Sequence, residues 1–116
     1  VALLALLRSR FVRYQVHGGS MAPALQPGDY LVADLAAYTR RMPSPGDLVL
    51  ATDPREATRT VVKRVERVDL HRQAWLTGDN ATESTDSRVF GAIPADLVRG
   101  RIVFRYHPLS RLGFPR

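Results

Sequence analysis

Residues 18–34, GGSMAPALQPGDYLVAD, carry a serine loop that passes through a Pro-Gly-Asp turn into an apolar strand. The same turn followed by apolar residues returns at 45–51, PGDLVLA. Proline and glycine in adjacent positions are typical of tight β-turns. The two stretches therefore predict two similar entries from a turn into a strand, with Asp29 and Asp47 as turn residues.

The β pattern extends in both directions from this stretch. Segments rich in valine, leucine and aromatic residues lie at 11–16, 30–35, 47–52, 60–68, 74–77 and 101–106. Turn signals separate them, and short strands at such spacing predict a mostly β fold, a small antiparallel sandwich or barrel-like core. We expect at most a brief helical turn at 94–98. Because the chain has 116 residues and no linker, we expect a single domain, 1–116.

Charge and cysteine content narrow the function classes. The formal charge is +6, which suits contact with an anionic membrane surface or nucleic acid, or only keeps the protein soluble. Because there is no cysteine, disulfides, thiol nucleophiles and cysteine-bound zinc are excluded. His71 and His107 lie in separate turns without a carboxylate partner at ligand spacing. We therefore predict no metal site and no cofactor.

The first fifteen residues join an apolar run, VALLALL, to the basic residues Arg8, Arg10 and Arg13. A membrane-spanning helix needs about 20 apolar residues, so this run is too short to span a membrane. Segment 1–15 is open to three interpretations: the stub of an anchor, an interfacial segment, or an ordinary element of the core.

Lys63 is the single lysine of the chain, whereas the other sixteen basic residues are arginine. A guanidinium keeps its proton at any usable pH, but burial can make a lysine amine neutral, so a site that needs an amine base needs lysine. Strand alternation in TVVKRVERV places Lys63 on the same face as Val61 and Val65. The pattern predicts either a lysine in an apolar setting or an exposed strand residue in an arginine-rich composition.

Ser20 follows two glycines, which leave room for a substrate chain to approach. A nucleophilic serine also needs a base within reach and a donor for the oxyanion, and the Ser20 amide is one such donor. A lone serine in a glycine-rich loop is usually only a loop residue. Here it accompanies the single lysine and a polar cluster, GDNATESTDSRVFG, at 78–91.

Taken together, these elements resemble the signal peptidase I family of Ser/Lys-dyad proteases. The resemblance covers residues 16 to about 107 and rests on Gly19-Ser20-Met21, Pro23, Leu25, Gly28-Asp29, Val62-Lys63-Arg64-Val65, Gly78-Asp79-Asn80, Ser84, Asp86-Ser87-Arg88 and Phe90-Gly91. It implies that Ser20 attacks the scissile carbonyl and that Lys63 accepts the hydroxyl proton.

The resemblance also implies supporting roles. Ser84 falls where the family places a hydroxyl that holds the lysine amine, and Gly19 and Met21 flank the nucleophile. Asp86 and Arg88 correspond to a structural charge pair beside the site. The structural positions near the site are Asp79, Asn80, Asp86, Ser87 and Arg88.

One departure concerns the oxyanion hole. Many family members have a serine where this chain has Gly18, and the glycine removes that side-chain donor. The second donor is left unassigned, and backbone or water are the alternatives. The large inserted domain of some bacterial members is also missing.

Within the family, the short stretch between Lys63 and Gly78 is similar to compact bacterial proteases that mature nickel-type superoxide dismutase. The stretch from residue 84 to 114 is equally similar to mitochondrial inner membrane protease subunits. The resemblance implies a precursor protein with an N-terminal leader or signal peptide as substrate, bound as an extended chain along a strand edge, with small side chains next to the cut. It implies no nucleic-acid partner. For location it leaves a bacterial protein that is either membrane-associated or cytoplasmic.

Three alternatives stay open. A self-cleaving repressor-type protease shares the Ser/Lys chemistry, but only nineteen residues precede Ser20 and they show no helix-turn-helix pattern. A non-catalytic basic β module that binds nucleic acid or membrane would explain the charge but not the single lysine. A histidine triad would need His17 to fold back across the glycines towards Ser20, with Asp29 as its partner.

Overall fold

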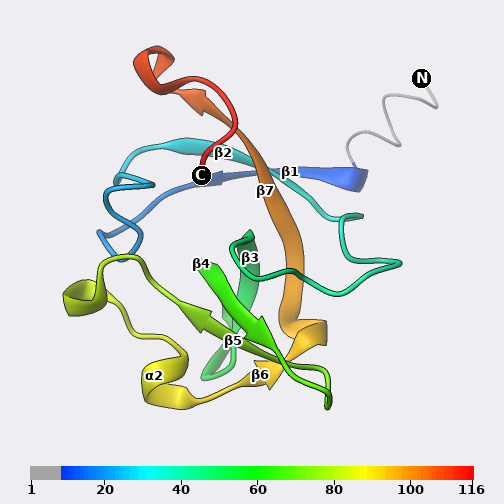
Figure 1. Ribbon diagram of the computed structural model, residues 1–116. Helices are drawn as coiled ribbons and strands as arrows, with labels where there is room; N and C mark the ends of the chain where they lie inside the picture. Colours follow the sequence, from blue (N-terminus) through cyan, green and yellow to red (C-terminus); the bar gives the residue numbers. More distant parts are fainter. Residues whose placement is uncertain (1–8) are drawn as a thin grey trace.

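The computed structural model describes residues 9–116, so the apolar run at 1–7 lies outside the described residues. Its seven strands (Figure 1) are β1 (Phe11–Gln15), β2 (Tyr30–Asp34), β3 (Leu48–Asp53), β4 (Glu56–Val68), β5 (Gln73–Thr77), β6 (Ile93–Pro94) and β7 (Val98–His107). Its helices are η1 (Ala81–Glu83), α2 (Ser87–Phe90), η2 (Ala95–Leu97) and η3 (Leu109–Arg111). None of the helices described in 9–116 has the length and apolar character needed to cross a membrane.

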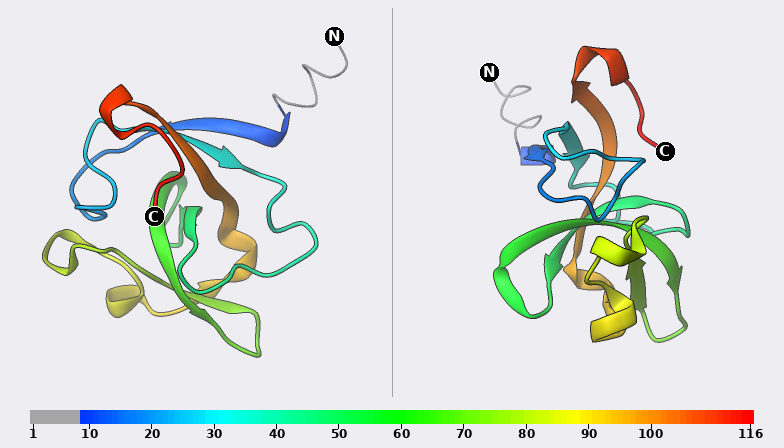
Figure 2. Two further views of the ribbon diagram at one scale, coloured as in Figure 1. Left: turned by 45° about the horizontal axis from the view of Figure 1, so that its top comes forward. Right: turned by 90° about the vertical axis from the view of Figure 1, so that its left-hand side faces the viewer.

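All seven strands form one antiparallel sheet in the order β1-β2-β7-β3-β4-β5-β6. The sheet is strongly curved, as the two views in Figure 2 show. The curvature brings β1, at one edge, towards β4, and the Tyr14 hydroxyl donates a hydrogen bond to the Thr60 carbonyl oxygen at 3.3 Å. The mostly antiparallel β prediction is confirmed, and of the two predicted arrangements the curved sheet is closer to the barrel-like core than to the sandwich.

The sequence predicted the strands more completely than the helices. Each of the six predicted segments overlaps a strand, although β4 and β7 begin earlier than predicted, and the helical turn expected at 94–98 is η2. Strand β6 was not predicted, because two residues are too short to show alternation. Helix α2 was not predicted either. It is a single turn capped by Asp86, whose side chain accepts a hydrogen bond from the Arg88 amide.

Two equivalent turns hold the segments that carry the predicted serine and lysine. Both turns have glycine at positive φ, +89° at Gly28 and +92° at Gly46, as the position after proline in a type II turn requires. The Gly28 amide donates to the Val16 carbonyl oxygen at 2.9 Å, and the Gly46 amide donates to the Val65 carbonyl oxygen at 2.8 Å. The repeated Pro-Gly-Asp phrase therefore fixes the backbone four residues before Ser20 and two residues after the lysine.

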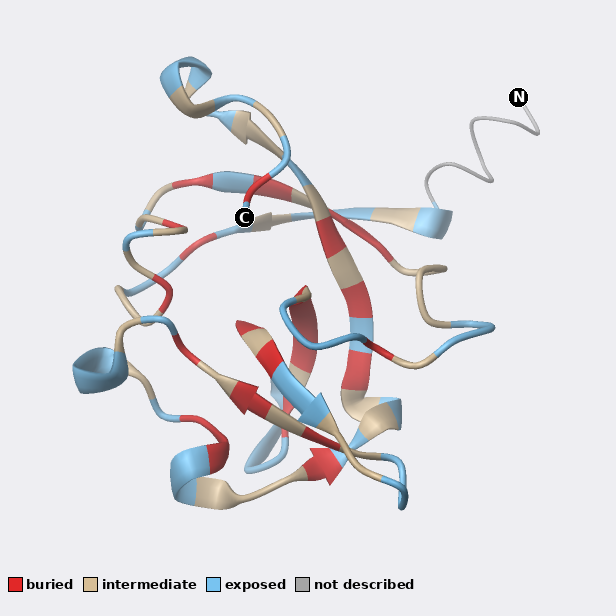
Figure 3. Cartoon of the chain, viewed as in Figure 1, coloured by how far each residue is buried: buried red, intermediate tan, exposed pale blue. Residues whose placement is uncertain are grey.

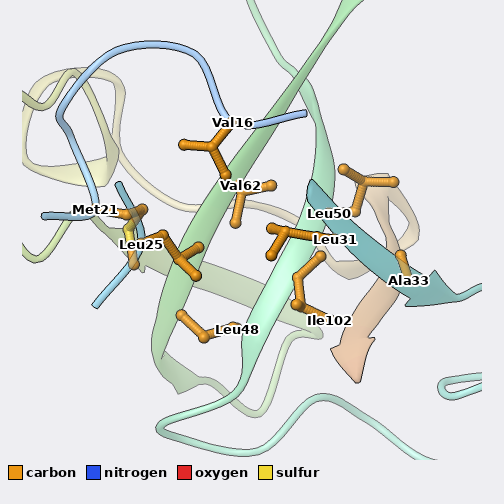
Figure 4. Packing of buried hydrophobic residues seen from close by; sticks show 9 residues of the cluster. All are labelled: Val16, Met21, Leu25, Leu31, Ala33, Leu48, Leu50, Val62 and Ile102. Atoms are coloured by element: carbon orange, nitrogen blue, oxygen red, sulfur yellow. The ribbon is translucent and has the colours of Figure 1, made fainter. Parts of the chain in front are cut away.

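The serine loop is anchored in a hydrophobic cluster between the two halves of the curved sheet (Figure 4). Its members are Val16, Met21, Leu25, Leu31, Ala33, Leu48, Leu50, Val62 and Ile102. Met21 and Leu25 belong to the loop itself and are 2% and 0% exposed. Full burial of side chains of this size contributes about 1.5–3 kcal/mol each. Because Val62 lies in the same cluster, the core fixes the serine loop against β4.

A second hydrophobic cluster covers the part of the sheet formed by β3, β4, β5, β6 and the start of β7. Its buried members are Val49, Ala51, Val65, Ala74, Leu76, Ile93 and Val98. Figure 3 shows that buried residues dominate β3 and alternate with less buried ones along the first half of β7. Lys63 lies opposite Val49 in the antiparallel pair and is buried, so its strand face agrees with the alternation seen in the sequence.

Candidate active site

A cleft of about 460 Å³ lies between the serine loop and β4, and both Ser20 and Lys63 border it. Ser20 enters from the loop that Met21 anchors in the core, and Lys63 enters from an inner strand of the sheet. The two residues are 43 positions apart in the sequence. The fold therefore brings the predicted nucleophile and the predicted base to one cavity.

A chain of hydrogen bonds encloses the lysine amine. The Lys63 side chain is 5% exposed, and its Nζ donates to Ser84 Oγ at 2.9 Å. Ser84 Oγ in turn donates to Asp86 Oδ2 at 2.6 Å. Ser84 thus connects the amine to a carboxylate that does not itself touch it.

Asp86 is fully buried, and several donors stabilise its charge. Its oxygens accept hydrogen bonds from the Gly78 amide at 2.8 Å, from Ser84 Oγ, and from the guanidinium of Arg88. Burial alone would raise the pKa of Asp86, but these donors outweigh burial and hold the pKa well below its usual range. The carboxylate therefore stays ionised and keeps Ser84 oriented.

Burial is the main influence on the amine. It lowers the pKa of Lys63, because a charged ammonium loses its hydration in this setting. The negative charge of Asp86 acts in the opposite direction, whereas the guanidinium groups of Arg59, Arg88 and Arg55 lower the pKa further. The net effect is a pKa below the ordinary lysine value, which shifts the amine towards the neutral form that accepts a proton.

The polar loop after β5 joins the two sides of the cleft. The Asn80 amide donates to the Ser20 carbonyl oxygen at 2.8 Å. Asp79 forms two hydrogen bonds of 2.8 Å with Arg64 of β4. Ser87 is buried, and its Oγ accepts the Leu76 amide at 2.8 Å. These three residues hold the loop and do not reach the amine.

Gly78 lies where the serine and lysine sides meet. A Cβ added to Gly78 would overlap the Ser84 side chain and would come within 2.7 Å of the Ser20 carbonyl oxygen. Only glycine therefore fits between the loop and the hydroxyl that holds the amine. The sequence named Gly78 as part of the resemblance but did not assign it this close contact.

The serine side of the cleft is less enclosed. Ser20 is half-buried, and within residues 9–116 the amides of Gly19 and Ser20 donate no hydrogen bond to the protein. Gly18 has φ +74° with open space where a Cβ would stand. The Ser20 amide is thus free to serve as an oxyanion donor, and the structure adds the Gly19 amide as a second unused donor beside it.

Other residues of the cleft were not predicted from the sequence. Arg55, Arg59 and Glu83 line it, and the Glu83 carboxylate packs against Gly19. Alternation along β4 was the signal available for Arg59, because an even spacing of four residues separates it from Lys63. No pattern in the sequence indicated that η1 would bring Glu83 to the serine loop.

The histidine alternative finds no support in the contacts. His17 lines the cleft and packs edge-on against Tyr14. The carboxylate of Asp29 is bound by Arg111 at 3.0 Å and by the Gln26 amide at 2.9 Å. Among residues 9–116, no cluster of three or more His, Cys, Asp or Glu side chains is arranged to hold a metal ion.

A serine on a loop with unused backbone amides, bordering the same cavity as a buried lysine, is an arrangement suited to acyl transfer. The sequence profile described as signal peptidase, peptidase S26, matches residues 1–68 and 70–107, which is nearly the whole chain. The chain therefore belongs to the signal peptidase family, peptidase S26, and its enzyme class is that of a serine endopeptidase.

Individual relatives agree with the family. The chain is similar to "Mitochondrial inner membrane protease subunit 1" of Homo sapiens, with 34% identity over 118 residues, 85% of this chain and 71% of the human protein. It is also similar to "Mitochondrial ATP-independent inner membrane protease subunit 1a" of Arabidopsis thaliana, with 32% identity over 84% of this chain and 71% of that protein. "Probable signal peptidase I-1" of Synechocystis sp. shares 27% identity over 96% of this chain and 80% of its own length.

Proposed function

We propose that this endopeptidase uses Ser20 as nucleophile and Lys63 as general base, and that it removes an N-terminal leader or signal peptide from a precursor protein. The observation that carries the proposal is the buried Lys63 amine, held by Ser84 in the same cleft that Ser20 borders. Family membership supports the reaction class, and the names of the relatives support leader removal.

Each step of the proposed reaction has a group to perform it. Ser20 Oγ attacks the scissile carbonyl carbon while its proton passes to the neutral Nζ of Lys63. The carbonyl oxygen becomes an oxyanion, which the Ser20 amide stabilises, with the Gly19 amide as the candidate second donor. Collapse breaks the peptide C–N bond, and the protonated Lys63 returns the proton to the leaving amine. Water then attacks the ester carbonyl of the acyl-enzyme while Lys63 accepts its proton, and the ester C–O bond breaks as Lys63 returns that proton to Ser20 Oγ.

The substrate would lie as an extended chain between two strand edges. Strand β5 pairs with β4 only from Arg64 onwards, so among the described strands the preceding part of β4 pairs with β3 alone. Its other edge faces β1 and the start of the serine loop, where Tyr14 crosses to Thr60. A peptide placed there would pair its main chain with the strand edges and lead its scissile bond to Ser20.

For the precursor protein and the cellular location, the support comes from the names of the relatives and from the net charge. Two of the relatives are named for the mitochondrial inner membrane, which supports an enzyme that works at a membrane. The net charge of +6 suits an anionic membrane surface. Maturation of nickel-type superoxide dismutase, in a bacterial cell, stays a prediction about the precursor.

The test compares wild type, Ser20→Ala and the control Ser110→Ala, in which an exposed serine of η3 is replaced. Internally quenched, alanine-rich peptides are the probe, and mass spectrometry locates any cut. We expect cleavage by wild type and Ser110→Ala and at least about 10³-fold less by Ser20→Ala. Equal cleavage by Ser20→Ala would remove Ser20 from the mechanism. Peptide binding without cleavage in all three proteins would favour the binding module.

A further inference from the structure

We propose that Arg59 forms a subsite for an acidic side chain of the substrate, about four residues along the extended chain from the scissile bond. This inference rests on the proposed function and adds a substrate preference to it. Arg59 lies on β4, directly before the regularly paired residues 60–64, and lines the cleft together with Val61 and Lys63.

The spacing follows from strand geometry. Arg59 precedes Lys63 by four residues, and at about 3.3 Å per residue their Cα atoms are roughly 13 Å apart along the strand. A substrate chain that pairs with this edge advances at the same rise. Its residue at the level of Lys63 is the one being cut, so the side chain facing Arg59 is about four residues away.

Of the two arginines that line the cleft in the described part of the chain, Arg59 is the one without a close partner. Arg55 donates two hydrogen bonds to the buried carboxylate of Asp53, at 3.1 and 3.0 Å. Arg59 approaches Asp53 only at 3.9 Å, through Nε, and its side chain is 58% exposed. Within residues 9–116, the Arg59 guanidinium donates no hydrogen bond, so its donors are available to a ligand. A carboxylate is the group that matches this planar fork of donors.

Arg59 borders the cleft together with Tyr14 and Lys63, and its charge acts on both. Burial raises the pKa of Tyr14, and the charge of Arg59 acts against that rise. The same charge also lowers the pKa of Lys63. Tyr14 belongs to β1, and Lys63 lies on β4 beside Ser84. The positive charge of Arg59 therefore acts on the part of the cleft between Tyr14 and Lys63.

The other end of the cleft has the opposite charge. Glu83 packs against Gly19, directly beside the nucleophile. A substrate carboxylate near the cut would be repelled by Glu83, whereas one beside Arg59 would be attracted. The cleft therefore predicts a position-dependent preference and not a general affinity for acidic peptides.

The experiment moves one charged residue along an alanine-rich peptide. Asp, Asn or Lys is placed in turn at each position within five residues of the cleavage site. The rate kcat/KM is measured for wild type, Arg59→Gln, Arg59→Glu and the control Arg40→Gln, which removes an exposed arginine of the loop between β2 and β3. Binding of the same peptides to Ser20→Ala, with and without Arg59→Gln, is measured by fluorescence anisotropy. Circular dichroism checks that each variant is folded.

We expect Asp to exceed Asn by about two- to five-fold at one position about four residues from the cut, as for an exposed ion pair. Arg59→Gln should abolish that preference, Arg59→Glu should replace it by a preference for Lys, and Arg40→Gln should leave it intact. Cleavage with no acidic preference at any position, or with a preference that survives Arg59→Gln, would overturn the inference alone. If wild type cuts no peptide, the proposed function fails, and the anisotropy series still decides whether Arg59 selects an acidic side chain.

Discussion

The cleft has a lysine side, the part of β4 that carries Lys63, and a serine side, the loop that carries Ser20. Similar turns hold both sides, but the two reactive side chains are enclosed to different degrees. Behind each, a Pro-Gly-Asp turn holds the backbone through hydrogen bonds to a valine, Val16 on the serine side and Val65 on the lysine side. In front, the Lys63 amine is buried and bound to Ser84, whereas Ser20 is half-buried.

This difference follows from the proposed chemistry. A lysine becomes a base near neutral pH only where water is excluded from its amine. The groups that enclose the amine must therefore be in place before the substrate binds. A nucleophile and its oxyanion donors must instead stay open to the incoming carbonyl. The contrast makes the lysine side sensitive to changes in its polar partners and the serine side sensitive to changes in loop position.

Replacing the amine by a guanidinium should have the largest effect. Lys63→Arg keeps the positive charge but cannot supply a neutral base, so we expect kcat to fall by about 10³-fold or more. Lys63→Met serves as a second variant, because it fits an apolar setting without the bulk of arginine. Peptide cleavage and far-UV circular dichroism are measured for both. Wild-type turnover in a folded Lys63→Arg protein would contradict the division of roles between the two sides.

Gly78→Ala should disturb both sides together. The new Cβ would press on the Ser84 side chain and on the Ser20 backbone, and overpacking of this kind costs about 1–3 kcal/mol of unfolding free energy. We expect kcat/KM to fall by about 10²-fold. Chemical denaturation and peptide cleavage measure the two effects.

Gly19→Ala is the matched control for that substitution. Its Cβ would meet only the flexible end of Glu83, so the unfolding free energy should change by less than about 1 kcal/mol. If Gly19→Ala proved as destabilising as Gly78→Ala, the close contact at Gly78 would not be what connects the lysine side to the serine side.

Ser84→Ala should affect the lysine side alone. It removes the hydroxyl between the amine and Asp86, and we expect kcat to fall by about 10-fold while KM stays unchanged, since Ser84 orients the base. Ser84→Thr keeps a hydroxyl and should restore part of the rate. A rise in KM with unchanged kcat would instead place Ser84 in substrate binding.

The sequence predicted the strands and the turns better than the residues that line the cleft. Alternation in β4 gave Lys63 the correct face, and the Pro-Gly-Asp phrase gave both turns, because these features depend on residues close together in the sequence. The approach of Glu83 to Gly19 depends on how η1 folds across 64 positions of chain, and no local pattern encodes it. The same holds for the fit of Gly78 between Ser84 and Ser20.

The smallest expected effect concerns stability and pH. Burial lowers the pKa of Lys63 in the folded protein, so below that folded pKa the amine is charged in both states and the full cost of burying it is present. As pH rises from the lowered folded pKa towards the ordinary lysine value, the unfolded state holds more protons, and the folded protein gains stability.

Lys63→Met lacks this gain, because it has no proton to lose. Any advantage that Lys63→Met has in unfolding free energy at neutral pH should therefore shrink as pH rises, by about 1.4 kcal/mol for each unit by which the pKa is lowered. Urea unfolding of both proteins between pH 6 and about 10 measures the difference. A difference that does not change over this range would mean that the amine keeps its ordinary pKa, and the lysine side would then be no more enclosed than the serine side.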